Sequence, residues 1–377
     1  MKEYFMNQPI VPDLEQFSAL SKEAFSTRCL TNNGKFYQEF EDKLKDFLEC
    51  DYIIPVTNAT VGLFTALKVL NIKGEVITVL FTFPATFNLL FNFVEITPVF
   101  VDISPETFCI SPESIRKSIT EKTVAILPVN AYGFPCDVEA IDEIAGQSNL
   151  KVIYDATPSF AVKYRNRSIV NFGDISVLSF HATKVFNTGE GGAIVCKSEE
   201  LYQKCKHFID HGIIDRDCIE LSGFNGKLDE IRSIMGILNL QKVSYAIECR
   251  KNVVEKYLAL FSKVKSEKIV IPHSLYASPD TVLNYTYFPI VASSEDIRDL
   301  ICEELRKNGI HARKYYYPNP SDMPNIKIPA GRVETMSNTS FISKRVLCLP
   351  VNPYFTDSDC AYIQETLLKV FKANGIA

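Results

Sequence analysis

The sequence predicts an α/β fold in which a mostly parallel sheet carries helices on both faces. Short apolar runs alternate with helical patterns from Tyr52 onward, which is typical of parallel strands joined by crossover helices. Polar residues follow several of these runs, at the sheet edge where ligands usually bind in such folds. The chain has 377 residues, of which 46% are hydrophobic and 23% charged, enough for a large domain and a smaller one.

The N-terminal part is expected to be a leader followed by two helices. Residues 1–30 contain Pro9 and Pro12 and a pattern that favours a short helix near residues 14–25. Turn-forming residues 31–34 (TNNG) come next. Residues 36–48 then place apolar side chains on one face at helical spacing, which predicts a second helix.

The alternating region supplies the strands and helices of the sheet. Strands are predicted at residues 53–57, 75–79, 98–102, 124–129, 152–155 and 175–180. Helices are predicted between them at residues 61–70, 112–119 and 138–146. One further short apolar run occupies residues 193–196.

The C-terminal part predicts a smaller α+β domain. Residues 228–264 favour one or two long helices, and a strand (285–290), a helix (294–307) and a final helix (358–373) follow. We therefore expect a large α/β domain over residues 1–250, including the leader, and a small domain over residues 251–377.

Composition argues against several functional classes. The net charge of -5 and the lack of a long basic run make nucleic acid an unexpected partner. No apolar stretch approaches the ~20 residues that span a bilayer, and residues 1–12 lack a signal-peptide layout. The eleven cysteines are scattered without a CxxC pair, which indicates reduced thiols, a cytoplasmic protein and no metal site.

Lys184 is the most informative residue. It lies in the segment SFHATK (179–184), between a predicted strand and the apolar run at 193–196, and the glycine-rich turn NTGEGG (187–192) follows it. A lysine in an apolar setting has a lowered pKa and becomes a nucleophilic amine, as a Schiff base with pyridoxal 5'-phosphate (PLP) requires. We expect the glycines to let a bulky partner approach, although this segment alone fits an ordinary hairpin lysine equally well.

Other residues add to the hypothesis of a PLP site. Asp155 ends a predicted strand and would suit the pyridine nitrogen, although an aspartate that caps a turn is the commoner case. Asn58, Ala59 and Thr60 precede a predicted helix, where backbone N–H groups bind phosphate or an asparagine simply caps the helix. Ser179 and Asn225 could also reach a phosphate, and Phe83 could stack on the ring or merely fill the core.

Taken together, these segments resemble the DegT/DnrJ/EryC1/StrS aminotransferases, which are PLP-dependent and act on nucleotide sugars. The resemblance covers nearly the whole chain and is carried by residues 31–34, 57–60, 81–86, 98–102, 179–192 and 223–230. The segments around Lys184 and Asn225 are the most specific. Among subgroups the chain is most similar to the dTDP-4-amino-4,6-dideoxyglucose transaminases.

The resemblance implies a fold of type I, with a seven-stranded sheet, and a role for each site residue. Lys184 would form the Schiff base and shuttle the proton, and Asp155 would hold the pyridine nitrogen. Phe83 would stack on the ring, while Ala59, Thr60 and Ser179 would hold the phosphate. Asn225 would reach the phosphate in the other subunit, which implies a homodimer with shared active sites.

Two positions depart from the family pattern. Asn130 stands where histidine is frequent, and Pro158 stands where glutamine or histidine usually contacts the cofactor or substrate. Proline cannot donate a hydrogen bond. We therefore expect the cofactor residues to be intact and the substrate side of the pocket to be altered.

The resemblance implies an aminotransferase that moves an amino group from L-glutamate to the ketone of a nucleotide-linked 4-keto-6-deoxy sugar, for a surface polysaccharide such as capsule or O-antigen. An alternative is a small phosphorylated ketone such as dihydroxyacetone phosphate, or a 3-keto sugar. A second alternative is a non-catalytic sensor of the same fold. A PLP-dependent sugar dehydratase is disfavoured because such enzymes have histidine in place of Lys184.

Overall fold

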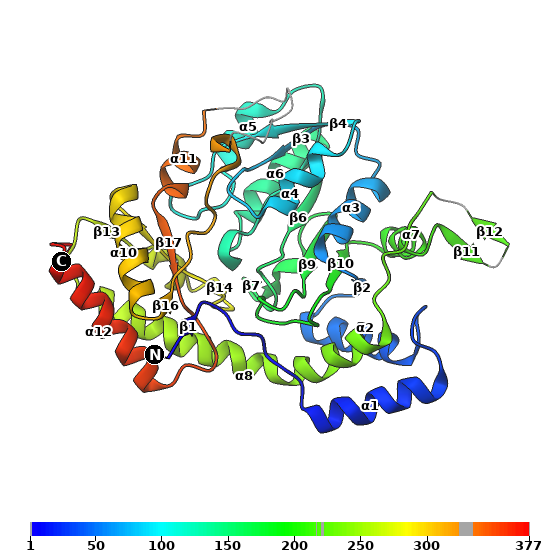
Figure 1. The fold of residues 1–377 in the computed structure, drawn as a ribbon. Coiled ribbons are helices and arrows are strands. Elements are labelled where there is room, and N and C mark those ends of the chain that lie inside the picture. Colours follow the sequence, from blue (N-terminus) through cyan, green and yellow to red (C-terminus); the bar gives the residue numbers. More distant parts are fainter. Residues whose placement is uncertain (1, 216, 220–221, 324–334, 377) are drawn as a thin grey trace.

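The protein is represented by a computed structural model that describes residues 2–215, 217–219, 222–323 and 335–376 (Figure 1). Its central sheet has seven strands in the spatial order β2, β10, β9, β6, β5, β3, β4. β10 is antiparallel to both its neighbours, and the other pairs are parallel. The α/β class and the mostly parallel sheet are thus confirmed. The strands are β2 (Ile53–Val56), β3 (Gly74–Thr78), β4 (Ile96–Phe100), β5 (Thr123–Ile126), β6 (Lys151–Asp155), β9 (Ile175–Ser179) and β10 (Gly192–Cys196).

Helices enclose this sheet, and the longest extends beyond it. Figure 1 shows α8 running along the lower side of the molecule to α1 and α2, which both contact it. α8 is a single helix, and it begins where the side chain of Asp229 accepts a hydrogen bond from Arg232 N. The helices are α1 (Leu14–Thr27), α2 (Lys35–Leu48), α3 (Ala59–Val69), α4 (Pro84–Phe91), α5 (Pro112–Ser118), α6 (Val138–Ser148), α7 (Glu199–Ile209) and α8 (Glu230–Phe261).

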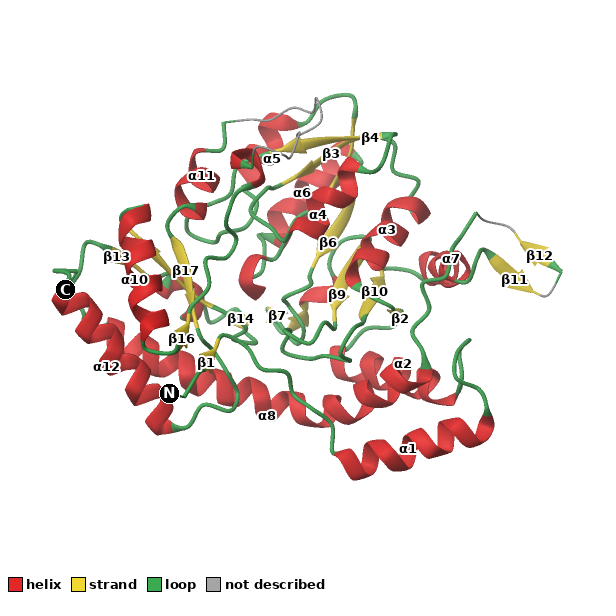
Figure 2. Cartoon of the chain, viewed as in Figure 1, coloured by secondary structure: helices red, strands yellow, loops and turns green. Residues whose placement is uncertain are grey.

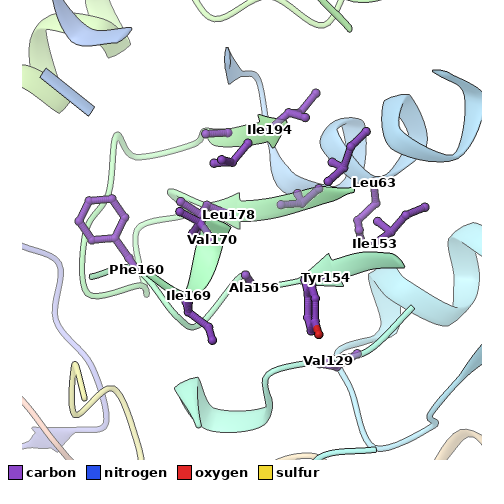
Figure 3. Packing of buried hydrophobic residues seen from close by; sticks show 14 of the residues in the cluster. Leu63, Val129, Ile153, Tyr154, Ala156, Phe160, Ile169, Val170, Leu178 and Ile194 are labelled. Atoms are coloured by element: carbon purple, nitrogen blue, oxygen red, sulfur yellow. The ribbon is translucent and has the colours of Figure 1, made fainter. Parts of the chain in front are cut away.

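The main core lies on the apolar strands predicted from the sequence. Figure 3 shows Ile153, Leu178 and Ile194, which come from the neighbouring strands β6, β9 and β10 and are all fully buried. Leu63 of α3 belongs to the same cluster. Strands buried on both faces are continuous apolar runs, which explains why the sequence pattern located them.

A second apolar cluster gathers the C-terminal elements. A three-stranded sheet of β13 (Ile269–Val270), β15 (Phe288–Ala292) and β17 (Val346–Leu349) packs with α10 (Glu295–Lys307) and α12 (Asp357–Ala373). The N-terminal strand β1 (Tyr4–Phe5) joins this part by pairing with β16 (Ile310–His311), so the first residues lie beside the C-terminal elements. The domain boundary near residue 250 stays a prediction.

The remaining elements are short (Figure 2). They are β7 (Lys163–Tyr164), β8 (Arg167–Ser168), β11 (Ile213–Asp215), β12 (Cys218–Ile219), α9 (His273–Tyr276), β14 (Thr281–Val282), α11 (Ser337–Ser343) and the 3-10 turns Ala131–Gly133, Ile169–Asn171 and Pro320–Asp322.

Several elements were not predicted. α4 was missed because its sequence, PATFNLLF, is apolar nearly throughout and has no helical stripe. α7 was missed because charged residues surround its narrow apolar face. β17 was missed because it pairs with β15, which lies more than fifty residues earlier in the chain. The hairpin of β11 and β12 projects from the body, where no burial pattern marks its strands. Among the described residues, no helix is long and apolar enough to cross a membrane.

Candidate active site

A cavity of about 470 Å³ opens at the carboxyl ends of β2, β6 and β9. Parallel strands bring their ends to one edge, so residues far apart in sequence meet here. Six of the seven predicted site residues line the cavity: Ala59, Thr60, Phe83, Asp155, Ser179 and Lys184.

Lys184 lies in the loop that links β9 to β10. Backbone hydrogen bonds close this loop on itself, from Ala182 N to Gly189 O (2.8 Å) and from Thr188 N to Phe180 O (2.9 Å). Two glycines of the turn, Gly191 and Gly192, serve the packing of the chain, and the approach of a bulky partner stays a prediction. A Cβ on Gly191 would lie 2.1 Å from Thr188 Oγ1, and one on Gly192 would lie 2.8 Å from Ala59 N. Glycine here lets the loop and the start of β10 approach α3 closely.

Burial of the Lys184 amine lowers its pKa to about 8, an effect that the Arg313 guanidinium reinforces and the Asp155 carboxylate opposes. An amine with such a pKa is partly unprotonated near neutral pH. Lys184 is therefore a better nucleophile and base than an exposed lysine.

Asp155 is held in a fixed orientation at the end of β6. Its side chain is 3% exposed, and its Oδ2 accepts a hydrogen bond of 2.6 Å from the Thr86 hydroxyl. Its Oδ1 accepts a second one from Thr157 N at 3.2 Å. A buried carboxylate with fixed donors is an anionic group that can hold a protonated ring nitrogen.

The start of α3 forms the opposite wall. Asn58 caps the helix by accepting a hydrogen bond from Val61 N at 2.9 Å, as the simpler sequence interpretation allowed. The N–H groups of Ala59 and Thr60 have no acceptor within the helix, and the helix dipole is positive here. The Ser179 hydroxyl lines the same cavity. These donors suit a phosphate group.

Phe83 and Asn225 occupy contrasting positions. Phe83 is 47% exposed although it lines the cavity, which leaves an aromatic face free for a flat ligand. Asn225 is exposed and is not among the lining residues; its backbone bridges to Asp210. The single chain therefore does not bring Asn225 to its own Lys184.

The two departures from the family pattern are buried outside the cavity lining, and the expected alteration of its substrate side stays a prediction. Neither Asn130 nor Pro158 lines the cavity. Asn130 is fully buried and its Oδ1 accepts a hydrogen bond from Cys136 N at 3.0 Å. Pro158 is also buried, and its carbonyl accepts one from Asn284 Nδ2 at 2.8 Å. Both positions support loops behind the site.

Sequence reasoning missed several lining residues: Thr86, Thr157, Glu190, Tyr287, Arg313 and Tyr315. Arg313 and Tyr315 belong to a basic, tyrosine-rich stretch, residues 313–318 (RKYYYP). Only folding brings that stretch, some 130 residues after Lys184, to the cavity. His181 also lines it, with its Nε2 3.7 Å from Glu190 Oε1.

The described residues contain no cluster of histidine, cysteine, aspartate or glutamate that could hold a metal ion. The donor set instead fits PLP. The cavity combines a lysine with a lowered pKa, a buried carboxylate, an exposed aromatic face and a helix N-terminus.

Comparisons with known proteins agree with this chemistry. Residues 13–368 match the DegT/DnrJ/EryC1/StrS aminotransferase family. A dTDP-4-amino-4,6-dideoxy-D-glucose transaminase of Shigella dysenteriae is 40% identical over 372 residues, covering 98% of this chain and 99% of that one. A 3-oxo-glucose-6-phosphate:glutamate aminotransferase of Bacillus subtilis is 30% identical, covering 90% and 77%.

A solved structure shares the fold over nearly its full length. Helicobacter pylori PseC, an aminotransferase involved in the biosynthesis of pseudoaminic acid, superposes with a TM-score of 0.89 at 26% identity, covering 99% of this chain and 100% of that one. The protein is therefore a PLP-dependent aminotransferase, and it belongs to the DegT/DnrJ/EryC1/StrS aminotransferase family.

Proposed function

We propose that the protein transfers an amino group from L-glutamate to the ketone of a nucleotide-linked 4-keto-6-deoxy sugar. The observation that carries the proposal is the meeting of Lys184 and Asp155 in one cavity with the start of α3. The similarity to the S. dysenteriae transaminase, whose name specifies a 4-amino-4,6-dideoxy sugar, supports this substrate class.

When bound, PLP supplies an electron sink for the negative charge that develops on the reacting carbon. Ala59, Thr60 and Ser179 would hold its phosphate, and Phe83 would stack on its ring. Asp155 would keep a proton on the pyridine nitrogen. Thr86 contributes by fixing Asp155 Oδ2 at 2.6 Å.

Lys184 would move the proton that the reaction requires. Its free amine takes a proton from Cα of the amino donor and later delivers one to C4 of the sugar. A pKa of about 8 suits both directions, because both forms of the amine are populated near neutral pH. The amino acid becomes a 2-oxo acid and the ketone becomes an amine.

We expect a homodimer in which Asn225 completes the partner's phosphate site. Two features support this arrangement. Asn225 is exposed and away from its own cavity, and the neighbouring hairpin carries the exposed side chains of Ile213, Ile214 and Ile219. Exposed apolar side chains on a projecting hairpin favour contact with another chain.

A role in a surface polysaccharide such as capsule or O-antigen follows from the proposed product class. A cytoplasmic location agrees with the eleven free cysteines.

A 3-keto sugar phosphate is the second candidate substrate. The B. subtilis relative, named for 3-oxo-glucose-6-phosphate, favours it at 30% identity. Dihydroxyacetone phosphate remains the smallest alternative of this kind. A non-catalytic sensor is disfavoured because Lys184 and Asp155 lie in one cavity.

Replacement of the lysine tests the proposed chemistry. Lys184→Ala should abolish amino transfer while the protein still binds pyridoxamine phosphate, since the phosphate donors and Asp155 remain. Lys314→Gln is the matched control, because Lys314 pairs with Asp299 (2.6 Å) and does not line the cavity. Full activity of Lys184→Ala would refute the assignment.

A further inference from the structure

Arg313 is a cation of the cavity, and no carboxylate of the described residues pairs with it. Among the described residues no salt bridge involves its guanidinium, whereas the adjacent Lys314 pairs with Asp299 at 2.6 Å. The other charged groups are already accounted for: Glu190 faces His181, and Asp155 accepts hydrogen bonds from Thr86 and Thr157. An unpaired guanidinium in a cavity is suited to bind an anionic ligand.

The backbone of Arg313 is fixed by strand-like pairing. Arg313 N donates to Cys348 O at 3.0 Å, and Cys348 N donates to Arg313 O at 2.8 Å. The guanidinium carbon lies 4.4 Å from the centre of the Tyr315 ring. Stacking on a buried ring and pairing with β17 pre-organise the side chain, which lowers the entropy lost when it binds a ligand.

Arg313 also lies near the reacting amine. Both residues line the same cavity, and the positive charge of Arg313 contributes to the lowered pKa of Lys184 after the larger effect of burial. An anion held by Arg313 would therefore lie beside the carbon on which Lys184 acts.

We propose that Arg313 binds the α-carboxylate of the amino-acid donor. This carboxylate is bonded directly to the carbon that loses its proton, so it must lie next to Lys184. The diphosphate of a nucleotide sugar is attached at C1, across the ring from a C4 ketone, and lies farther from the reacting carbon. The planar guanidinium matches a carboxylate with two parallel hydrogen bonds. The inference rests on the proposed aminotransfer and extends it to recognition of the donor.

The two half-reactions separate this role from others. Four proteins would be loaded with PLP and mixed with L-glutamate: wild type, Arg313→Gln, Arg313→Lys and the control Lys314→Gln. The change in cofactor absorbance would give the glutamate concentration at half-saturation. Each protein in its pyridoxamine phosphate form would then be mixed with a dTDP-4-keto-6-deoxy sugar. Calorimetric titration of glutarate, which has neither an amino nor a keto group to react, into the PLP form measures carboxylate binding without turnover.

We expect Arg313→Gln to raise the half-saturating glutamate concentration about 10- to 100-fold and to weaken glutarate binding similarly. Arg313→Lys should recover part of this loss, because lysine keeps the positive charge but cannot form the two parallel hydrogen bonds of a guanidinium. The half-saturating sugar concentration should stay within about twofold of wild type, and so should both half-reactions of the control. An equal or larger loss with the sugar, or unchanged glutamate binding, would overturn the assignment.

Failure of the proposed function gives a different result. If wild type reacts with glutamate but with no nucleotide sugar, the proposal for the sugar substrate fails. The measurements with glutamate still decide the role of Arg313. If wild type uses only an amine that lacks a carboxylate, the assignment of Arg313 fails with it.

Discussion

The hydroxyl of Thr86 donates a hydrogen bond of 2.6 Å to Oδ2 of Asp155, and both side chains are buried. Thr86 in turn lies 3.1 Å from the hydroxyl of Thr82. A short chain of hydroxyl groups from the start of α4 thus orients the carboxylate at the end of β6. Thr86 is a positioning residue that the sequence did not reveal.

Removing this hydroxyl should weaken the hold on Asp155. Thr86→Val keeps the shape but loses the donor, and a hydrogen bond to a charged group is worth about 1.5–3 kcal/mol. We expect the single-turnover rate with glutamate to fall by about 10- to 100-fold. Thr86→Ser should retain most of the rate because the hydroxyl remains. Equal rates for the valine variant and wild type would show that Asp155 needs no such support.

The lowered pKa of Lys184 predicts a pH-dependent reactivity. With a pKa of about 8, about a tenth of the amine is unprotonated at pH 7, far more than for an ordinary lysine. Reductive methylation of Lys184 in the apo-protein, followed by mass spectrometry, should rise with pH around a midpoint near 8.

Lys256 provides the internal control, since its hydrogen bond with Asp357 raises its pKa above the ordinary value. Its methylation should rise only at higher pH than that of Lys184. If the two lysines titrate together, the cavity does not perturb the amine of Lys184.

Gly34 and Glu230 join two of the family-like segments. The carboxylate of Glu230 is 2% exposed and accepts hydrogen bonds of 2.9 Å from Phe36 N and Tyr37 N at the start of α2. A Cβ on Gly34 would lie 2.7 Å from Glu230 Cδ, so the carboxylate would have to move and lose these bonds. We expect Gly34→Ala to lower the free energy of unfolding by about 1–3 kcal/mol in urea titrations.

Gly146 of α6 is the matched control, because a Cβ there meets nothing within 4 Å. Gly146→Ala should raise the free energy of unfolding by about 0.5–1 kcal/mol, since alanine favours a helix. Destabilisation by both substitutions to a similar degree would contradict the packing argument at Gly34.

Sharing of the active site between subunits can be tested by complementation. Lys184→Ala and Asn225→Ala should each be poorly active at limiting PLP. If Asn225 serves the partner's site, a mixed dimer contains one site with both residues and should have about half of the wild-type activity. A random equimolar mixture, in which about half of the dimers are mixed, should recover about a quarter. If Asn225 serves its own chain, every site in the mixture lacks one residue and activity should not return.

The sequence predicted those parts of the fold that depend on local patterns of apolar and polar residues. β6 and β9 are mostly apolar, and Asp155 and Ser179 end them, so the carboxyl edge of the sheet could be located. Lys184 was identified by the segments on either side of it. The N-cap role of Asn58 also followed from its place before a helix.

Other features depend on contacts between distant parts of the chain. Nothing local shows that Arg313 reaches Lys184, because this proximity requires the pairing of Arg313 with Cys348. Asn130 and Pro158 follow β5 and β6, yet neither lines the cavity: Asn130 Oδ1 accepts a hydrogen bond from Cys136 N, and the Pro158 carbonyl accepts one from Asn284 Nδ2. The direction of a side chain in an irregular loop cannot be predicted from the sequence, because loop residues do not follow the regular spacing of a helix or a strand.

The central claim is tested most directly by the return of PLP absorbance from the pyridoxamine form. The protein would be converted with L-glutamate, freed of excess donor, and mixed separately with dTDP- and UDP-4-keto-6-deoxy sugars, 3-oxo-glucose-6-phosphate and dihydroxyacetone phosphate. We predict a rapid return with one nucleotide-linked 4-keto sugar and the matching amino sugar in the mass spectrum. A return only with a phosphorylated ketone, or with no ketone of the panel, would contradict the proposed substrate class.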